Sequence, residues 1–255
     1  MVQTSYSVNI PIAFQGLIAD DGFHDITSYL NAETIGMSFG IGVRQGTNDD
    51  QCLLPTATTQ SLLGVTVSNF AYNQFSPTTL TGTQGIPSLA AAGVMTRGRI
   101  YVLPTQDVTP ASKVFCQMVA NGSTKVAGSF RTDYDGTAQV TTMTPTAVNS
   151  TEYQLEVDGR FYGYTSDSSA TATEIVTGLT TAITADEGAT VTPTGTATLI
   201  LTAKTAGLPF LAQGDANMAF VTGTPNAANA IPVPNARFKT TATALTPAVL
   251  EISLP

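Results

Sequence analysis

The chain has 255 residues, of which 42% are hydrophobic and only 11% are charged, and its formal net charge is −8. This length suits one large or two small domains, and no apolar run approaches the roughly 18 residues of a membrane helix. Ten Lys and Arg residues against 18 acids argue against direct nucleic-acid binding, which needs cations to displace counterions from phosphates.

An ordinary soluble domain has about 25% charged residues, so Thr, Ser, Asn, Gln and Gly must cover much of this surface. Charge is depleted at the cores of protein interfaces, and the composition therefore predicts an assembly protein. The first ten residues, MVQTSYSVNI, contain no basic residue and no long apolar stretch. We therefore expect no secretory signal and a soluble chain made in the cytoplasm.

Residues 1–35 form the first expected element. They carry aromatic side chains without sustained periodicity, at Tyr6, Phe14, Phe23 and Tyr29. Two interpretations remain open for this segment. It either packs on its own domain or forms an arm that lies along a neighbouring subunit.

Strand patterns dominate the next part of the chain. β-Branched and aromatic residues, separated by turn residues, predict strands at 61–70, 93–103, 113–120 and 236–244. Asn121-Gly122 lies between two such segments and predicts a β-hairpin, because both residues tolerate a positive φ. We expect residues 36–144 and 235–255 to form one discontinuous β-rich domain with a barrel-like or sandwich-like body.

Composition changes after Thr144, and again at a Pro- and Asn-rich stretch over 223–235, which predicts an inserted domain over 145–234. Strands are expected at 153–157 and 160–165, followed by a helix over 171–185 and two more strands. Thr171 and Glu174 fit a capping box, and the apolar residues of the helix form one stripe. The predicted fold class is mainly β with an inserted ββαββ α+β domain.

No residue pattern predicts catalysis or metal binding. His24 is the single histidine, no serine lies in a nucleophile elbow, and Cys52 and Cys116 fit no metal or redox spacing. Asp135-Gly136 is typical of a turn and lacks the remaining ligands of a calcium loop. We therefore expect no enzyme, no metal and no cofactor.

Several short motifs resemble the structural cement proteins of tailed bacteriophages. They are SYSVNIPIAFQGLIADDGFHDITSY, IGMSFGIGVRQG, LLGVTVSNF, the hairpin AAGVMTRGRIYVLPTQDVTPASKVFCQMVANG and the closing NARFKTTATALTPAVLEISLP. The chain departs from the family pattern by the insertion of residues 145–234, and by Ala111 where the pattern has glycine. The inserted part resembles a small α/β module of phage tail and other virion proteins.

The resemblance implies a capsid decoration protein that forms a homotrimer. It would bind the major capsid protein on the exterior of the virion and clamp neighbouring subunits. It implies no membrane partner and manufacture in the host cytoplasm. The arm would then supply the capsid contacts, with these candidate residues: Tyr6, Ile10, Phe14, Phe23 and Tyr29. Two alternatives remain open, a tail tube or adaptor protein and a capsid-surface adhesin that binds host carbohydrate.

Overall fold

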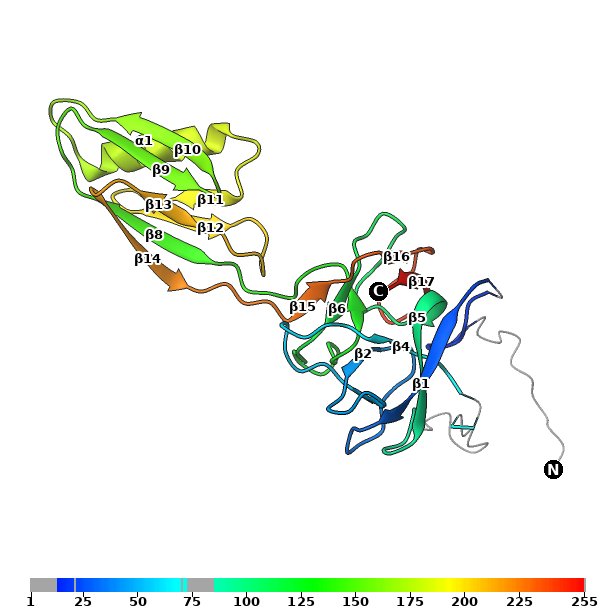
Figure 1. Ribbon diagram of the computed structural model, residues 1–255. Helices are drawn as coiled ribbons and strands as arrows, with labels where there is room; N and C mark the ends of the chain where they lie inside the picture. The colour runs from blue at the N-terminus through cyan, green and yellow to red at the C-terminus, as the bar shows by residue number, and fades with distance from the viewer. Residues whose placement is uncertain (1–12, 21, 70, 73–84, 255) are drawn as a thin grey trace. The chain divides into compact units, whose positions relative to one another are not determined.

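The computed structural model describes residues 13–20, 22–69, 71–72 and 85–254. Within them lie seventeen strands, β1 to β17, and one helix, α1 (Figure 1). The predicted mainly β fold class is therefore confirmed. No helix in the described ranges is both long and apolar enough to cross a membrane.

The chain divides into two compact units. Unit 1 comprises Met1–Asp133 and Asn229–Pro255, and unit 2 comprises Tyr134–Ala228. The strands of unit 1 are β1 (Asp25–Asn31), β2 (Gly42–Gln45), β3 (Gln51–Leu53), β4 (Gly64–Thr66), β5 (Ala91–Val102), β6 (Phe115–Gln117), β7 (Phe130–Arg131), β15 (Ala230–Pro232), β16 (Arg237–Phe238) and β17 (Ala248–Ser253).

Unit 1 is built around a seven-stranded sheet in the order β1-β3-β2-β4-β5-β17-β16. An additional antiparallel pairing between β1 and β5 joins the ends of the first five strands and closes them into a small barrel. A second sheet of three strands has the order β15-β6-β7. Closure protects the backbone groups of β1 and β5, which would otherwise be exposed at sheet edges.

Strand β5 joins the barrel to the C-terminal part of the sheet. Its first half pairs with β1 and β4, and its second half pairs with β17. The partner changes near Gly98, where φ is +138° and a Cβ atom would lie 2.9 Å from the Cβ atom of His24. Only glycine fits this backbone conformation and this close approach.

The core of unit 1 consists of two clusters of buried apolar side chains. One contains Met95, Ile100, Phe130, Phe238 and Leu250, each 0% exposed, together with other aliphatic residues. The other surrounds Phe39 and Ile86, inside the first part of the sheet. Burial of these side chains is the main stabilising contribution to the unit, because each large apolar side chain removed from water contributes about 1.5–3 kcal/mol.

Ion pairs between side chains connect β17 to β5 and to β16. The carboxylate of Glu251 accepts hydrogen bonds from Arg99 Nε at 2.7 Å and from Arg237 Nη2 at 2.8 Å, and Lys239 Nζ lies 3.5 Å away. Arg99 also pairs with Asp20 at 2.6 Å. The hydrogen bond from Arg99 and, after it, the contacts with Arg237 and Lys239 lower the pKa of Glu251 to about 2, although partial burial acts in the opposite direction.

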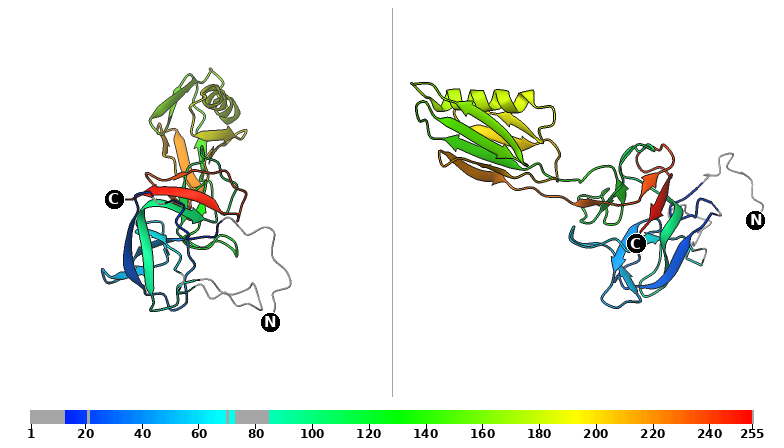
Figure 2. Two further views of the ribbon diagram at one scale, coloured as in Figure 1. Left: turned by 90° about the vertical axis from the view of Figure 1, so that its right-hand side faces the viewer. Right: turned by 45° about the horizontal axis from the view of Figure 1, so that its top comes forward.

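Unit 2 contains α1 (Ala172–Ala185) and seven strands: β8 (Val140–Pro145), β9 (Glu152–Val157), β10 (Arg160–Thr165), β11 (Val191–Thr194), β12 (Leu199–Ala203), β13 (Ala212–Gly214) and β14 (Met218–Thr224). They form two sheets, in the orders β10-β9-β13 and β11-β12-β8-β14. Figure 2 shows α1 covering one side of these strands.

The predicted helix and its capping box are confirmed. The Thr171 hydroxyl accepts from the Glu174 backbone N–H at 3.2 Å, and the Glu174 side chain accepts from the Thr171 N–H. Ile175, Val176 and Leu179 are fully buried against the strands. The apolar stripe therefore joins the helix to the core of unit 2, which also contains Tyr153, Leu155 and Leu201.

The arrangement of strands around the helix differs from a simple ββαββ module. β9, β10, α1, β11 and β12 follow one another in the chain, but β9 and β12 belong to different sheets. β13 extends the sheet of β9, and β8 pairs with both β12 and β14. Three further strands therefore complete the fold of unit 2.

The boundaries of unit 2 lie earlier in the chain than the predicted 145–234. β8 pairs with β12 from Val140 to Met143, so this segment belongs to unit 2 although the composition changes only after Thr144. At the other end, Ala230 to Pro232 pair with β6 of unit 1. That the two units are independently folding domains stays a prediction.

The Leu179→Ala substitution tests this independence. Leu179 is 0% exposed, and removing such a side chain costs about 2–5 kcal/mol because part of the cavity remains. We expect hydrogen exchange to accelerate throughout unit 2 while that of unit 1 stays unchanged. The exposed Thr184→Ala substitution on the same helix is the control. Equal acceleration in both units would contradict independent folding.

The Glu251→Gln substitution tests the charged contacts between β5, β16 and β17. The pKa of Glu251 is lowered in the folded state, so its stabilising contribution is present above about pH 4.5 and is lost as the pH falls toward 2. We expect the variant to be less stable at pH 7 by about 1 kcal/mol, since the partners are partly exposed. Thermal unfolding at several pH values should show this difference disappear at low pH.

Glu187→Gln is the matched control for that measurement. Glu187 is exposed and forms no ion pair with any described residue. The control should therefore unfold like the parent protein at every pH. If Glu251→Gln behaved in the same way, the contacts of Glu251 would not contribute to stability.

Candidate functional site

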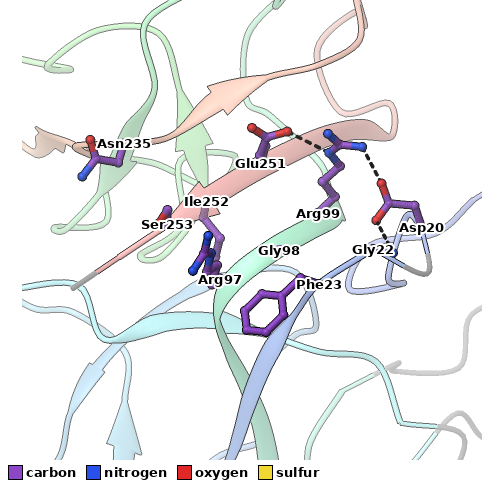
Figure 3. Close-up of a pocket in the computed structure, with 10 residues that line it drawn as sticks. All are labelled: Asp20, Gly22, Phe23, Arg97, Gly98, Arg99, Asn235, Glu251, Ile252 and Ser253. Carbon is purple, nitrogen blue, oxygen red and sulfur yellow. Dashed lines mark hydrogen bonds and ion pairs between the residues drawn. The ribbon is translucent and has the colours of Figure 1, made fainter.

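A surface depression of about 290 Å³ lies where β5, β17 and the loop before β1 meet (Figure 3). All of its lining residues belong to unit 1. They are Asp20, Gly22, Phe23, Arg97, Gly98, Arg99, Asn235, Glu251, Ile252 and Ser253. Antiparallel pairing of β5 with β17 places Arg99 opposite Glu251 and Arg97 opposite Ser253.

Two hydrogen bonds and one ion pair fix the loop formed by Asp20 and residues 22–24 beside β5. The Asp20 carboxylate accepts from the Gly22 N–H at 3.2 Å and also forms the ion pair with Arg99. His24 Nδ1 lies 3.0 Å from the Gly22 carbonyl oxygen. The loop can approach the strand this closely because Gly98 has no side chain beneath His24.

The loop presents Phe23 on the surface. This side chain is 75% exposed, and the Arg97 guanidinium carbon lies 4.9 Å from the centre of its ring. A cation–π contact of this kind contributes about 0.5–1 kcal/mol at an exposed site. Figure 3 shows both side chains beside the surface of β5. We call Phe23 and Arg97 together the Phe23–Arg97 platform.

The chemistry of the platform suits a protein contact. Arg97 forms no ion pair with any described residue, whereas Arg99 forms ion pairs with two carboxylates. Both carboxylates, Asp20 and Glu251, raise the pKa of Arg99, principally through the hydrogen bond to Glu251. Arg97 can therefore donate to a partner's acceptors while the Phe23 ring buries apolar area. Arginine and aromatic side chains are enriched at the energetic centres of protein interfaces.

The five predicted contact residues have different positions. Tyr6 and Ile10 lie outside the described residues. Phe14 and Tyr29 are half-buried, and Tyr29 packs against the Phe39 cluster as part of β1. Phe23 alone among the three described candidates is strongly exposed. Its role in contacting a partner stays a prediction.

The described part of the first 35 residues is integrated into unit 1. The N–H groups of Gly16 and Ala19 donate to the carbonyl oxygens of Tyr101 and Arg99, and Ile18 forms a bridge with Ile100. β1 follows directly and pairs with β5. From residue 16 onward, the described residues of the segment thus pack on their own unit, which is one of the two interpretations that the sequence left open.

The described residues contain no group of three or more His, Cys, Asp or Glu side chains that could hold a metal ion. Both cysteines are buried and free. Burial raises the pKa of Cys52 to about 11, with a smaller contribution from the charge of Glu33, and burial raises the pKa of Cys116 to about 12. Both thiols are therefore protonated at neutral pH, and the thiolate is the reactive form.

The ion pair between Arg99 and Glu251 was not among the features predicted from the sequence. The two residues are 152 positions apart, and their side chains meet only because β17 pairs with β5. Two sequence patterns are consistent with this ion pair. The strand AVLEIS contains one acid among apolar residues, and TRGRIYV contains two arginines at alternate positions. Opposite charges on the same face of paired strands are typical cross-strand partners.

Comparison with known proteins identifies a family. Residues 2–155 match the family described as "Structural cement protein (E217 gp24/Pam3 gp6)". The matched residues include the N-terminal segment of unit 1 from residue 2 to Asp133 and extend through most of β9 in unit 2. No curated protein matches the chain.

Two solved structures are similar over most of their length. A chain of "The capsid of Myoviridae Phage XM1" has a TM-score of 0.46 and 10% identity, covering 98% of this chain and 96% of that chain. A chain from "Mycobacterium phage Patience" has a TM-score of 0.26 and 11% identity, covering 92% of this chain and 95% of that chain. Both TM-scores are too low to carry an argument, so the assignment depends on the family match. On that match, this chain belongs to the phage structural cement proteins and has a structural role in the capsid.

Proposed function

We propose that this protein decorates the exterior of the assembled capsid, as a homotrimer, and clamps neighbouring subunits of the major capsid protein. The observation that carries this proposal is the family match over residues 2–155. The low charge content and the exposed Phe23–Arg97 platform support it, because both suit a chain whose surface is covered by other proteins.

The proposed mechanism is mechanical. A subunit that contacts two neighbours adds buried area between them, and this contact must be broken before the neighbours separate. A partner that binds only the assembled lattice stabilises that lattice by RT ln(1 + [L]/Kd). The protein therefore needs no reacting group. It needs a rigid body and exposed side chains that lose water readily.

The closed barrel of unit 1 supplies the rigid body. Phe23 is fixed on it by the loop contacts of Asp20 and His24, so little conformational entropy remains to be lost when the ring is buried. A preorganised aromatic side chain gains affinity for this reason. The platform is thus the candidate centre of the capsid contact.

The Phe23→Ala substitution tests this assignment. We expect it to weaken binding to purified capsid shells assembled without this protein by about tenfold, which corresponds to about 1.4 kcal/mol. Arg97→Ala should weaken binding by a similar factor. It removes the guanidinium that contacts the Phe23 ring, and with it the N–H donors that could bond to a partner. Cosedimentation of protein and shells measures the affinity.

Phe161→Ala is the matched control. Phe161 is 71% exposed, almost as much as Phe23, but it lies on β10 of unit 2, outside the family match. We expect this control to bind shells like the parent protein. Equal binding by all variants would remove the platform from the contact. Failure of the parent protein to bind shells, with binding to tails instead, would overturn the proposed function.

A further inference from the structure

Two exposed leucines of unit 1 have a backbone conformation that leucine rarely adopts. Leu89 and Leu245 both have a φ of +59°, and they are 73% and 54% exposed. In this left-handed region the Cβ atom crowds the following carbonyl oxygen, so glycine or asparagine is the usual residue. More than half of each side chain is exposed, so burial offsets this strain only in part. The fold by itself therefore does not require leucine at either position.

A buried asparagine holds the turn that contains Leu89. Asn31 is 0% exposed, and its Nδ2 atom donates to the carbonyl oxygens of Ile86 and Pro87 at 3.0 and 2.9 Å. Its Oδ1 atom accepts from the Glu33 N–H at 3.0 Å. The Leu89 N–H donates to the Asn31 carbonyl oxygen at 2.9 Å. Asn31 thus joins the turn after β1 to the turn before β5.

These two turns form an uncharged surface, which we call the Leu89 tip (residues 34–36 and 87–89). Ile35 is 68% exposed and lies on it with Leu89. The nearest acid in the sequence, Glu33, directs its carboxylate to the Leu54 N–H at 2.7 Å. Residues 34–36 and 87–89 therefore offer apolar side chains and include no charged residue that would resist the loss of water.

The turn that contains Leu245 is also exposed and uncharged. We call residues 243–247, TALTP, the Leu245 tip, and all five of them are exposed. The Leu245 N–H donates to the Pro104 carbonyl oxygen at 2.7 Å, and the Ala244 N–H donates to Asp107 at 2.9 Å. These bonds fix the tip to the segment that follows β5.

The two tips lie at opposite ends of β5. Leu89 precedes the first residue of the strand by two positions, and Pro104, the partner of Leu245, follows its last residue by two. The strand contains twelve residues, which span at most about 40 Å at roughly 3.3 Å per residue. Figure 1 shows β5 running beside β1 and then toward β17. One continuous strand therefore carries two separate apolar contact points.

We propose that the Leu89 tip and the Leu245 tip are the two ends of the clamp, and that each inserts into an uncharged surface of a different major capsid protein subunit. This inference rests on the proposed capsid-binding function and names the surfaces that perform it. Backbone strain that persists without a structural need is typical of functional contacts. The residues of both tips are themselves uncharged, which suits the core of such a contact, and the Asp107 carboxylate beside the Leu245 tip is bonded to the Ala244 N–H. The separation of the tips suits two partners.

The test compares Leu89→Gly, Leu245→Gly and the double variant with the parent protein. Ser150→Gly is the matched control, because Ser150 also has a positive φ, of +51°, but is polar and lies in unit 2. Glycine relieves the strain and deletes the side chain, so the thermal midpoint of each variant should be unchanged or raised. Binding and rupture temperature are measured on purified capsid shells assembled without this protein.

We expect each single leucine variant to bind shells about tenfold more weakly and to lose the rise in rupture temperature, because the platform and the remaining tip no longer reach the second subunit. The double variant should bind at least about a hundredfold more weakly. Parent-like binding and protection by both single variants would overturn this inference while leaving the proposed function intact. Loss of self-association instead of shell binding would also overturn it. If the parent protein itself did not bind shells, the proposed function would fail.

Discussion

Unit 1 depends on the way in which strand β5 divides its backbone hydrogen bonds between two sets of partners. Its first half closes the barrel with β1 and β4, and its second half holds β17. Gly98 permits the change of partner, since no side chain would fit beneath His24 at that point. Because the same strand carries Arg97 and Arg99, closure of the barrel also positions the platform and the ion pairs that stabilise β17.

Charge and apolar exposure have separate roles on unit 1. The arginine side chains beside Glu251 are neutralised within the unit, because its carboxylate accepts hydrogen bonds from Arg99 and Arg237. Three exposed features of the unit are instead apolar: Phe23 beside a single guanidinium, and the two leucine tips. The capsid contacts proposed for these features should therefore depend little on attraction between charges and should tolerate salt. That property suits a structural component of a capsid.

Local features of the fold could be predicted from the sequence, and features that depend on distant pairing could not. The Thr171–Glu174 capping box and the apolar stripe of α1 involve residues within a few turns, and the helix begins and ends within one residue of the expected range. By contrast, β8 belongs to unit 2 only because it pairs with β12 and β14, far along the chain. The hairpin at Asn121-Gly122 illustrates both: β6 and β7 pair as expected, but their connection is longer than a two-residue turn. Of the candidate site, the sequence indicated Phe23, whereas Arg97 becomes its partner through the tertiary fold.

We propose that the protein bridges neighbouring capsid subunits from the outside of the shell. Electron cryo-microscopy of intact virions can show both the position of the protein and its neighbours. We expect density for unit 1 on the exterior of the capsid, across the boundary between two major capsid protein subunits and repeated about a threefold axis. Density confined to the tail, or contact with a single capsid subunit only, would contradict it.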